Sequence, residues 1–350
     1  MEKNIIELED GAGGEKSNQI IGDIRKILNV KSKWTNTFDD GAVFELGDLR
    51  SHRPHPPRVR GTLSRVQERE IGKKLVFTTD AFIVDPLFFA GGDIGKIAMC
   101  GTINDLSVMG ARPIGIALSL VIEEGFSERD LEKIIKSIQA ISKQENVPIV
   151  TGDTKVTEKG KIDKLEITTS GVGLAQKIIS NAGAKVGDVV ITSGDLGEHA
   201  VALLASRFNY QTKIKSDCKP LTKEIQSVID FLTSAKDPTR GGLAAILNEL
   251  AEKSKAKIVL DEKNLPFKKE TEAISNLLGI DKFSFPSEGR FVATVSSVDA
   301  DKVIKILRKY NKEAKIIGEV VKGNGVWLKT KIGSVKKIDV PRGKLIPRIC

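Results

Sequence analysis

GGDIGKIAMCGTINDLSVMGARPIGIALSLV, residues 91–121, is the stretch of the chain that decides the fold. Its first half is predicted to form a glycine-containing helix from about Ile94 to Met109, and its second half a strand from Ile114 to Val121. Asn104 and Asp105 lie in the C-terminal half of that helix. A carboxylate embedded in an apolar run is costly unless it has a partner, so the position of Asp105 indicates a function.

Strands and helices alternate outward from this unit in both directions. The expected elements of this half of the chain are a helix over about 20–28, a buried strand at 75–79 that ends at Asp80, a helix that begins at a capping box of Ser127 and Asp130, a short strand at 149–150 before Asp153, and a strand at 166–174.

A domain boundary is expected near residues 181–187. The elements predicted beyond it are strands at 189–192, 258–260, 291–295, 315–320 and 326–330 and helices at 196–208, 222–233, 241–253 and 299–310. This pattern is typical of two α+β domains rather than one doubly wound sheet. We divide the chain into a glycine loop and helix (1–38), an N-terminal domain (39–178), a C-terminal α+β domain (179–334) and a flexible tail (335–350) that ends in Cys350.

The tail is expected to be extended. Pro341 and Pro347 fix their own φ and disfavour helix in the residues before them, so residues from about Val335 onward should be unpacked. Such a tail spans up to ~50 Å, enough to reach a cleft in its own body or in a partner. A thiol at its tip can carry a chemical group between sites, and the alternative is a frayed terminus that happens to end in cysteine.

The composition is that of an ordinary enzyme. With 350 residues, of which 40% are hydrophobic and 29% charged, the chain can bury two cores. The cysteines, Cys100, Cys218 and Cys350, have no metal-ligand spacing, and their odd number argues against a disulfide framework. No apolar stretch approaches the length of a membrane span, and the acidic N-terminus lacks a signal-peptide core. We therefore expect a cytoplasmic protein with no membrane partner.

The net charge of +9 does not indicate nucleic-acid binding. Six of these nine charges belong to a Pro/Arg/His-rich segment, residues 49–74, which has no interleaved aromatic residues. A basic patch confined to one such segment is a weak signal for nucleic acid. We predict a solvated loop inserted into the N-terminal domain.

A series of glycine-rich and acidic motifs then runs through nearly the whole chain. They are DGAGG (10–14), FDDGAVFEL (38–46), LFFAGGDIGK (87–96), GTINDLSVMGARP (101–113), VTGDTK (150–155), DPTRGGLA (237–244), SEGR (287–290) and PRIC (347–350). Together they resemble the HypE family of hydrogenase maturation proteins. The resemblance implies a two-domain PurM-like fold in which the N-terminal sheets of a homodimer join into a barrel. It also implies ATP-dependent dehydration of a carbamoyl group carried on the terminal cysteine, giving the cyanide ligand of an iron centre.

The same resemblance implies a set of site residues. The metal ligands for Mg²⁺ beside the triphosphate are Asp40, Asp80, Asp105 and Asp237. Further ATP-binding residues are Asn104, Asp153, Thr239, Gly241 and Gly242. Cys350 carries the carbamoyl group, and Lys155 or Glu288 removes protons.

The residue types agree with this chemistry. Mg²⁺ takes carboxylate and phosphate oxygens, and helix entries rich in glycine, such as Gly11, Gly13 and Gly14 or the second cluster at 241–242, can present backbone N–H groups to phosphate. The chain has no Walker motif. Asp39 is expected to be a turn residue instead.

Two other functions stay open at this point. One is a related ATP-dependent synthetase or kinase, such as a selenophosphate synthetase, although that class typically uses a cysteine near the N-terminal glycine loop and none precedes Cys100 here. The other is a non-catalytic nucleotide-binding scaffold. The partners implied by the resemblance are the carbamoyltransferase HypF, which loads the cysteine, and an iron-carrying HypC–HypD complex, which accepts the cyanide.

Overall fold

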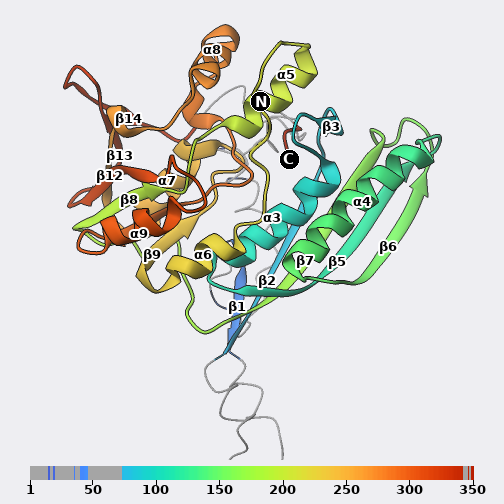
Figure 1. Ribbon diagram of the computed structural model, residues 1–350, viewed down its shortest axis with the longest axis horizontal. Helices are drawn as coiled ribbons and strands as arrows, with labels where there is room; N and C mark the ends of the chain where they lie inside the picture. Colours follow the sequence, from blue (N-terminus) through green and yellow to red (C-terminus); the bar gives the residue numbers. More distant parts are fainter. Residues whose placement is uncertain are drawn as a thin grey trace, which may run out of the picture.

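The computed structural model describes residues 40–45, 73–341, 346 and 348–350, with Glu15, Gln19 and Thr35 as single positions. Predictions that concern the first glycine cluster, the helix at 20–28, Asp39 and most of the basic segment lie outside these residues. In Figure 1 the described chain forms two sheets, each with its own helices, that lie beside each other. The predicted two-domain α+β architecture is confirmed.

The first sheet has five strands. In spatial order they are β1 (Ala42–Glu45), β2 (Lys74–Phe82), β7 (Leu165–Ala175), β5 (Arg112–Glu123) and β6 (Ile149–Thr157). Neighbouring strands are antiparallel except for β5 and β6, which are parallel. A short two-stranded ribbon, β3 (Phe88–Phe89) and β4 (Gly92–Asp93), precedes the central helix.

Two helices cover one face of this sheet, α3 (Ile94–Val108) and α4 (Glu128–Glu145). Ser127 caps α4 as the sequence predicts, because its Oγ accepts a hydrogen bond from the Asp130 N–H at 3.3 Å. Helix α3 is buried on almost every side. It packs on β2, β7 and α4 within its own domain and contacts elements of the second domain with its remaining surface, which explains why its sequence lacks a polar face.

Among the described residues, no helix covers the opposite face of the sheet. Most residues of the edge strand β6 are exposed, and those on this face include Asp153 and Lys155. Phe77 of β2 is also exposed on this side. An exposed edge strand beside an apolar sheet face is a surface that another chain can cover.

The second sheet has seven strands. In spatial order they are β14 (Val335–Ile338), β13 (Gly325–Lys329), β10 (Lys257–Asp261), β12 (Lys315–Val321), β8 (Asp188–Thr192), β11 (Val292–Ser296) and β9 (Leu232–Lys236). Its helices are α5 (Glu198–Phe208), α6 (Thr222–Val228), α7 (Gly242–Lys253), α8 (Lys269–Leu278) and α9 (Ala300–Leu307), with short 3₁₀ turns at Ile229–Phe231, Glu262–Asn264 and Lys282–Ser284.

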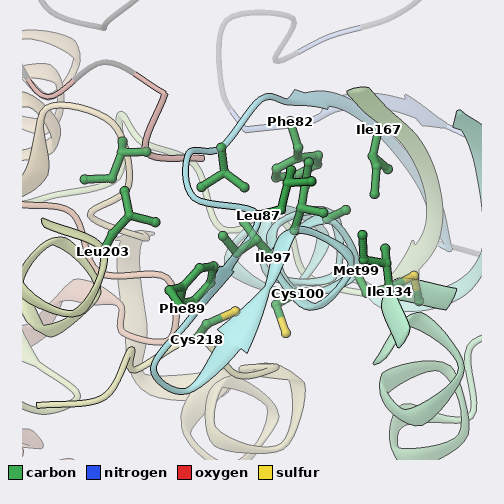
Figure 2. Packing of buried hydrophobic residues seen from close by; sticks show 14 of the residues in the cluster. Phe82, Leu87, Phe89, Ile97, Met99, Cys100, Ile134, Ile167, Leu203 and Cys218 are labelled. Atoms are coloured by element: carbon green, nitrogen blue, oxygen red, sulfur yellow. The ribbon is translucent and has the colours of Figure 1, made fainter. Parts of the chain in front are cut away.

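A shared core joins the two domains. Figure 2 shows side chains of the first domain, including Phe82 and Ile97, in one cluster with Leu203 and Cys218 of the second. The cluster continues to Ile349, close to the end of the chain. The position of the tail is therefore part of the packing that holds the two domains together.

Three expectations about the second half of the chain were wrong. The helix predicted for 222–233 ends in the 3₁₀ turn, and residues 232–236 form strand β9, which pairs with β11. Helix α8 was not predicted. The tail is not unpacked either, because its first residues form β14 against β13, while Ile346 and Ile349 are buried. The expectation of an unpacked tail overlooked the apolar side chains of Ile346 and Ile349, which can be buried whatever the backbone conformation around them.

None of the helices in the described ranges combines the length and apolar character that crossing a membrane requires.

Candidate active site

Four carboxylates meet where the two domains face each other. Asp40 precedes β1, Asp80 lies in β2, Asp105 lies in α3 and Asp237 follows β9. Asp40, Asp105 and Asp237 each have an oxygen within 4.8 Å of the others. The structure thus brings together the four aspartates that sequence analysis assigned to the metal.

The local geometry follows from strand and helix periodicity. Thr78 and Asp80 are two residues apart in β2, so both point to the face that α3 covers. The Thr78 hydroxyl donates to Asp105 Oδ2 at 2.9 Å, and Asp80 interacts with the same carboxyl group. Asp105 is therefore held between a strand and the helix that carries it.

Burial and mutual repulsion keep these groups from ionising together. Burial raises the pKa of Asp105 well above its ordinary value, and the charges of Asp80, Asp237 and Asp40 raise it further. Burial likewise raises the pKa of Asp237 to about 8, with a further contribution from Asp40. The pKa of Asp80 is also raised by burial, against the opposing effect of Arg240. Several carboxylates at one buried position need compensating positive charge to ionise.

Two cations stand at the edge of this cluster. Lys236 forms an ion pair with Asp40 and a second one, at 3.2 Å, with Glu249. Burial acts to lower the Lys236 pKa, but these two carboxylates raise it above the ordinary value, so the side chain is charged. Arg240 lies 4.0 Å from Asp80. Within the described ranges of the chain, two cations therefore face four carboxylates.

The cluster has the donor set of a divalent cation site. Asp237 Oδ2 is buried and has no hydrogen-bond partner in the part of the chain that the structure describes, and a buried polar atom without a partner needs an explanation such as an ion. Carboxylate oxygens are the ligands that Mg²⁺ takes in proteins, together with phosphate oxygens and water. The residues present therefore fit Mg²⁺.

The DPTRGG turn forms the wall on the side of the second domain. Gly241 and Gly242 both have positive φ, +79° and +59°, a region that side chains disfavour. A Cβ on Gly242 would lie 2.6 Å from the main-chain carbon of Ser284. Glycine at both positions lets the chain turn sharply into α7, and it directs Arg240 toward Asp80.

Cys350 lies beside this wall. Its carbonyl oxygen accepts a hydrogen bond from the Ile83 N–H at 3.5 Å, immediately after β2. Burial raises the pKa of the Cys350 thiol well above its ordinary value, and the negative charge of Glu288 raises it further, whereas Arg240 lowers it. The terminal thiol, Glu288 and Arg240 therefore face one another at the edge of the carboxylate cluster.

Glu288 is buried and held through its main chain. Its N–H donates to Asp217 Oδ1 at 2.9 Å, and its carbonyl accepts from Asn104 Nδ2 at 3.1 Å. Its own Oε1 is buried without a hydrogen-bond partner, and burial raises its pKa well above the ordinary value. A carboxyl group fixed in this way next to a thiol can hold or accept a proton.

Asn104 joins the two domains. Its Nδ2 also donates to the Lys219 carbonyl at 3.1 Å, and its Oδ1 accepts from the Leu221 N–H at 2.8 Å. The side chain is fully buried. Its amide thus binds the main chain of the second domain, and its contact with ATP stays a prediction.

Asp153 and Lys155 lie apart from the other predicted site residues. The structure does not bring them to the cluster of their own chain: they lie on the exposed edge strand β6, three strand spacings or ~14 Å from β2. Asp153 is on the same sheet face as Ala81, whereas Asp80 points to the other face. Lys155 pairs with Asp153 at 3.4 Å in a solvent-exposed position.

Sequence analysis missed four residues that shape the site. Thr78 and Lys236 directly contact the aspartates, and His199 and Arg207 of α5 contact the tail. Lys236 immediately precedes the DPTRGG motif, which is a signal that could have identified it. His199 and Arg207 are far from the tail in sequence, and only the fold brings them together.

Comparison with known proteins assigns two parts of the chain to one family. Residues 61–175 match the family described as AIR synthase related protein, N-terminal domain, and residues 185–331 match its C-terminal domain. Two relatives match over the full length. A putative hydrogenase expression/formation protein of Methanocaldococcus jannaschii is 41% identical over 97% of this chain and 98% of its own. The carbamoyl dehydratase HypE of Cupriavidus necator is 37% identical over 99% and 95%.

The chain is also similar to solved structures of HypE. A chain of the HypE–HypF complex is 35% identical, with a TM-score of 0.79 over 93% of this chain and 99% of its own. HypE in complex with ATP is 29% identical, with a TM-score of 0.76 over 99% and 100%.

Proposed function

Because the chain belongs to the family of the carbamoyl dehydratase HypE, we propose that it dehydrates a carbamoyl group carried on Cys350 at the expense of ATP. The product is a thiocyanate on the same sulfur, which supplies the cyanide ligand of a [NiFe]-hydrogenase iron centre. The protein is thus an enzyme that acts on its own terminal residue.

One observation carries this proposal. The Cys350 thiol, the buried carboxyl group of Glu288 and the Arg240 guanidinium face one another, next to the carboxylate cluster that fits a metal. A nucleotide kinase with a separate substrate has no need to place its own terminal thiol here. A non-catalytic scaffold has no need of a buried Glu288 carboxyl group hydrogen-bonded to that thiol.

The chemistry explains the need for ATP. In a thiocarboxamide, S–C(=O)–NH₂, the oxygen is a poor leaving group. Transfer of the γ-phosphoryl group to the carbonyl oxygen turns it into a phosphate ester, and the C–O bond then breaks to release phosphate. Both nitrogen-bound protons leave, and the C–N bond becomes the triple bond of S–C≡N. Glu288, with its raised pKa beside the sulfur, accepts a proton in this step.

The carboxylate cluster serves the triphosphate. Asp40, Asp80, Asp105 and Asp237 would hold Mg²⁺, which neutralises phosphate charge during transfer. Thr239 and the glycines at 241–242 line the entry to α7 and would contact the phosphates through a hydroxyl and main-chain N–H groups. Arg240 adds a cation between the cluster and Cys350.

Lys155 and Asp153 act across a homodimer in this proposal. Both lie on the exposed face and edge of the first sheet, the surface that would join a second copy into a barrel. We infer that Lys155 of the partner subunit completes the site in place of the Lys155 of the same chain. This arrangement reconciles the expected proton-removing role of Lys155 with its distance from Glu288.

Two further partners follow from the reaction. A carbamoyltransferase of the HypF type must load Cys350, and an iron-carrying HypC–HypD complex must accept the cyanide. Both must reach a sulfur that the docked tail partly encloses. The tail therefore leaves its docked position for loading and for transfer. The proposal retains the cytoplasmic location expected from the sequence.

Mass spectrometry tests the carrier role of Cys350. Incubation with the carbamoyltransferase, carbamoyl phosphate and ATP should add the carbamoyl mass to wild-type protein and then remove the mass of one water. Cys350→Ala should gain no mass but bind ATP with unchanged affinity. An equal mass gain on the variant would refute the proposal.

Glu288→Gln provides the matched control for the second step. The variant keeps Cys350 and the side-chain size at 288, so it should accept the carbamoyl group and retain it without losing water. If it loses water at the wild-type rate, Glu288 has no part in proton removal.

A further inference from the structure

Helix α5 holds the last residues of the tail by their main chain. His199 Nε2 lies 2.8 Å from the Ile349 carbonyl oxygen, and Arg207 Nη2 donates to the Arg348 carbonyl at 2.9 Å. The two side chains are eight residues, about two helical turns, apart on α5. They therefore bind consecutive carbonyl groups immediately before Cys350.

The tail also pairs with the segment that follows β2. The Asp85 N–H donates to the Arg348 carbonyl at 3.1 Å, and the Ile83 N–H donates to that of Cys350 at 3.5 Å. This is the register of an antiparallel pair. Arg207 also donates to the Asp85 carbonyl, from Nε at 2.9 Å and from Nη2 at 2.6 Å. One guanidinium thus bridges both strands of the pair.

The hydrogen bonds of the His199 ring show which of its nitrogens carries the proton. The Ile349 carbonyl can only accept, so Nε2 carries the proton, and Nδ1 must accept from the Ser216 hydroxyl at 2.8 Å. Ser216 Oγ in turn accepts from the Cys218 N–H at 3.1 Å. His199 is fully buried, and burial lowers its pKa, which favours this neutral tautomer.

Apolar packing alone would not set the position of the sulfur. Ile346 and Ile349 are buried in the shared core, but burial of two side chains is nondirectional and tolerates small shifts of the chain. Hydrogen bonds to two consecutive carbonyls do not tolerate such shifts, because each bond requires its own distance and angle. The hydrogen bonds from His199 and Arg207 go to main-chain carbonyls and not to the sulfur, so they are the same for the free thiol and for its adducts.

We propose that His199 and Arg207 are positioning residues that dock the tail through its main-chain carbonyls and so hold the group on Cys350 against Glu288. The inference rests on the carrier function proposed for Cys350. Its test requires neither ATP nor a carbamoyl group, so it can fail while the proposed function stands.

Alkylation of the cysteines measures docking directly. The rate of iodoacetamide labelling at Cys350 is followed by peptide mass spectrometry in wild type, His199→Ala and Arg207→Ala. Loss of one buried hydrogen bond should increase the undocked population, and hence the Cys350 labelling rate, by about tenfold. Cys100 and Cys218, which are buried in the body, report on the fold in the same sample and should label as slowly as in wild type.

Two conservative variants and one control complete the design. Arg207→Lys keeps the charge but cannot bridge two carbonyls as a fork, so it should label Cys350 at an intermediate rate, and His199→Gln should do the same. Ser206→Ala removes an α5 hydroxyl that donates to the Ala202 carbonyl within the same helix and contacts no described residue of the tail by a hydrogen bond, so this variant should behave as wild type. If an alanine variant fails to fold, its conservative counterpart is judged by the same criterion.

A second measurement separates docking from loading. With HypF-type carbamoyltransferase, His199→Ala and Arg207→Ala should load Cys350 at least as fast as wild type, while single-turnover dehydration slows. The inference is overturned if Cys350 labels at the wild-type rate in the folded variants. It is also overturned if Cys100 and Cys218 become reactive in parallel with Cys350, since that pattern indicates general loosening.

Discussion

Asp237 should make the metal-free protein less stable as the pH rises. Its pKa is about 8 in the folded chain, raised mainly by burial, against an ordinary value of 3.8. Between these two values the folded state binds a proton that the unfolded state has released, so the stabilising contribution is complete below about pH 4 and is lost as the pH approaches 8. One proton changes the free energy of unfolding by ~1.4 kcal/mol per pH unit, so about four units give an upper limit of ~6 kcal/mol.

The substitution Asp237→Asn isolates this contribution. Asparagine keeps the size of the side chain and cannot ionise. The free energy of unfolding of the variant should therefore depend less on pH, by the contribution of one proton. Urea unfolding of both proteins, followed by circular dichroism in EDTA between pH 5 and 9, gives the difference in free energy of unfolding. That difference should increasingly favour the variant with rising pH, by up to ~1.4 kcal/mol per unit, and become constant above about pH 8.

Magnesium with ATP should reverse the trend in the wild type. The cation competes with the proton for Asp237, so the stabilisation by Mg²⁺ and ATP should be larger at pH 8 than at pH 6, and this increase should be much smaller in Asp237→Asn. Asp130→Asn, at the start of α4, serves as the control and should retain the wild-type behaviour. Parallel pH dependences for wild type and Asp237→Asn would refute the assignment of the raised pKa to this residue.

Three more outcomes are expected. Gly242→Ala should lower the free energy of unfolding by more than Gly125→Ala does, because both glycines have positive φ but only Gly242 has main-chain atoms within 3 Å of the added Cβ; thermal melts compare the two. Asn104→Ala should cost at least ~2 kcal/mol in urea unfolding, since three buried hydrogen bonds between the domains are lost. Mixing Lys155→Ala with Glu288→Gln protein should restore about a quarter of the wild-type dehydration rate if the lysine acts across a twofold dimer, and none if it acts within one chain.

Sequence reasoning reached the fold because the elements around the active site are long and strongly patterned. Helix α3 and strand β5 combine an apolar run with a clear change of period. The meeting of the four aspartates was also open to inference, since each stands at the end of an apolar segment or inside one. Strand β9 and helix α8 were missed, because short or weakly apolar segments are ambiguous until their neighbours are known.

Other features depend on positions that only tertiary structure fixes. Motif membership placed Asp153 and Lys155 with the other site residues, but strand order puts them at the far edge of the sheet. Backbone rules for proline gave an extended tail and could not reveal that α5 supplies donors for its carbonyls. The hydrogen bonds of the Asn104 amide could not be predicted either, because its partners lie in two segments that are remote in the sequence.

The raised pKa of Cys350 indicates that loading and dehydration take place at different positions of the tail. Docked beside Glu288, the sulfur stays protonated, and a thiol is a poor nucleophile compared with a thiolate. It is therefore unsuited to attack a carbamoyl donor in that position, even if the donor could enter. Once loaded, the sulfur has no proton to lose, so its raised pKa no longer opposes the reaction. An environment that disfavours loading therefore does not disfavour dehydration, and we expect the tail to occupy different positions in the two steps.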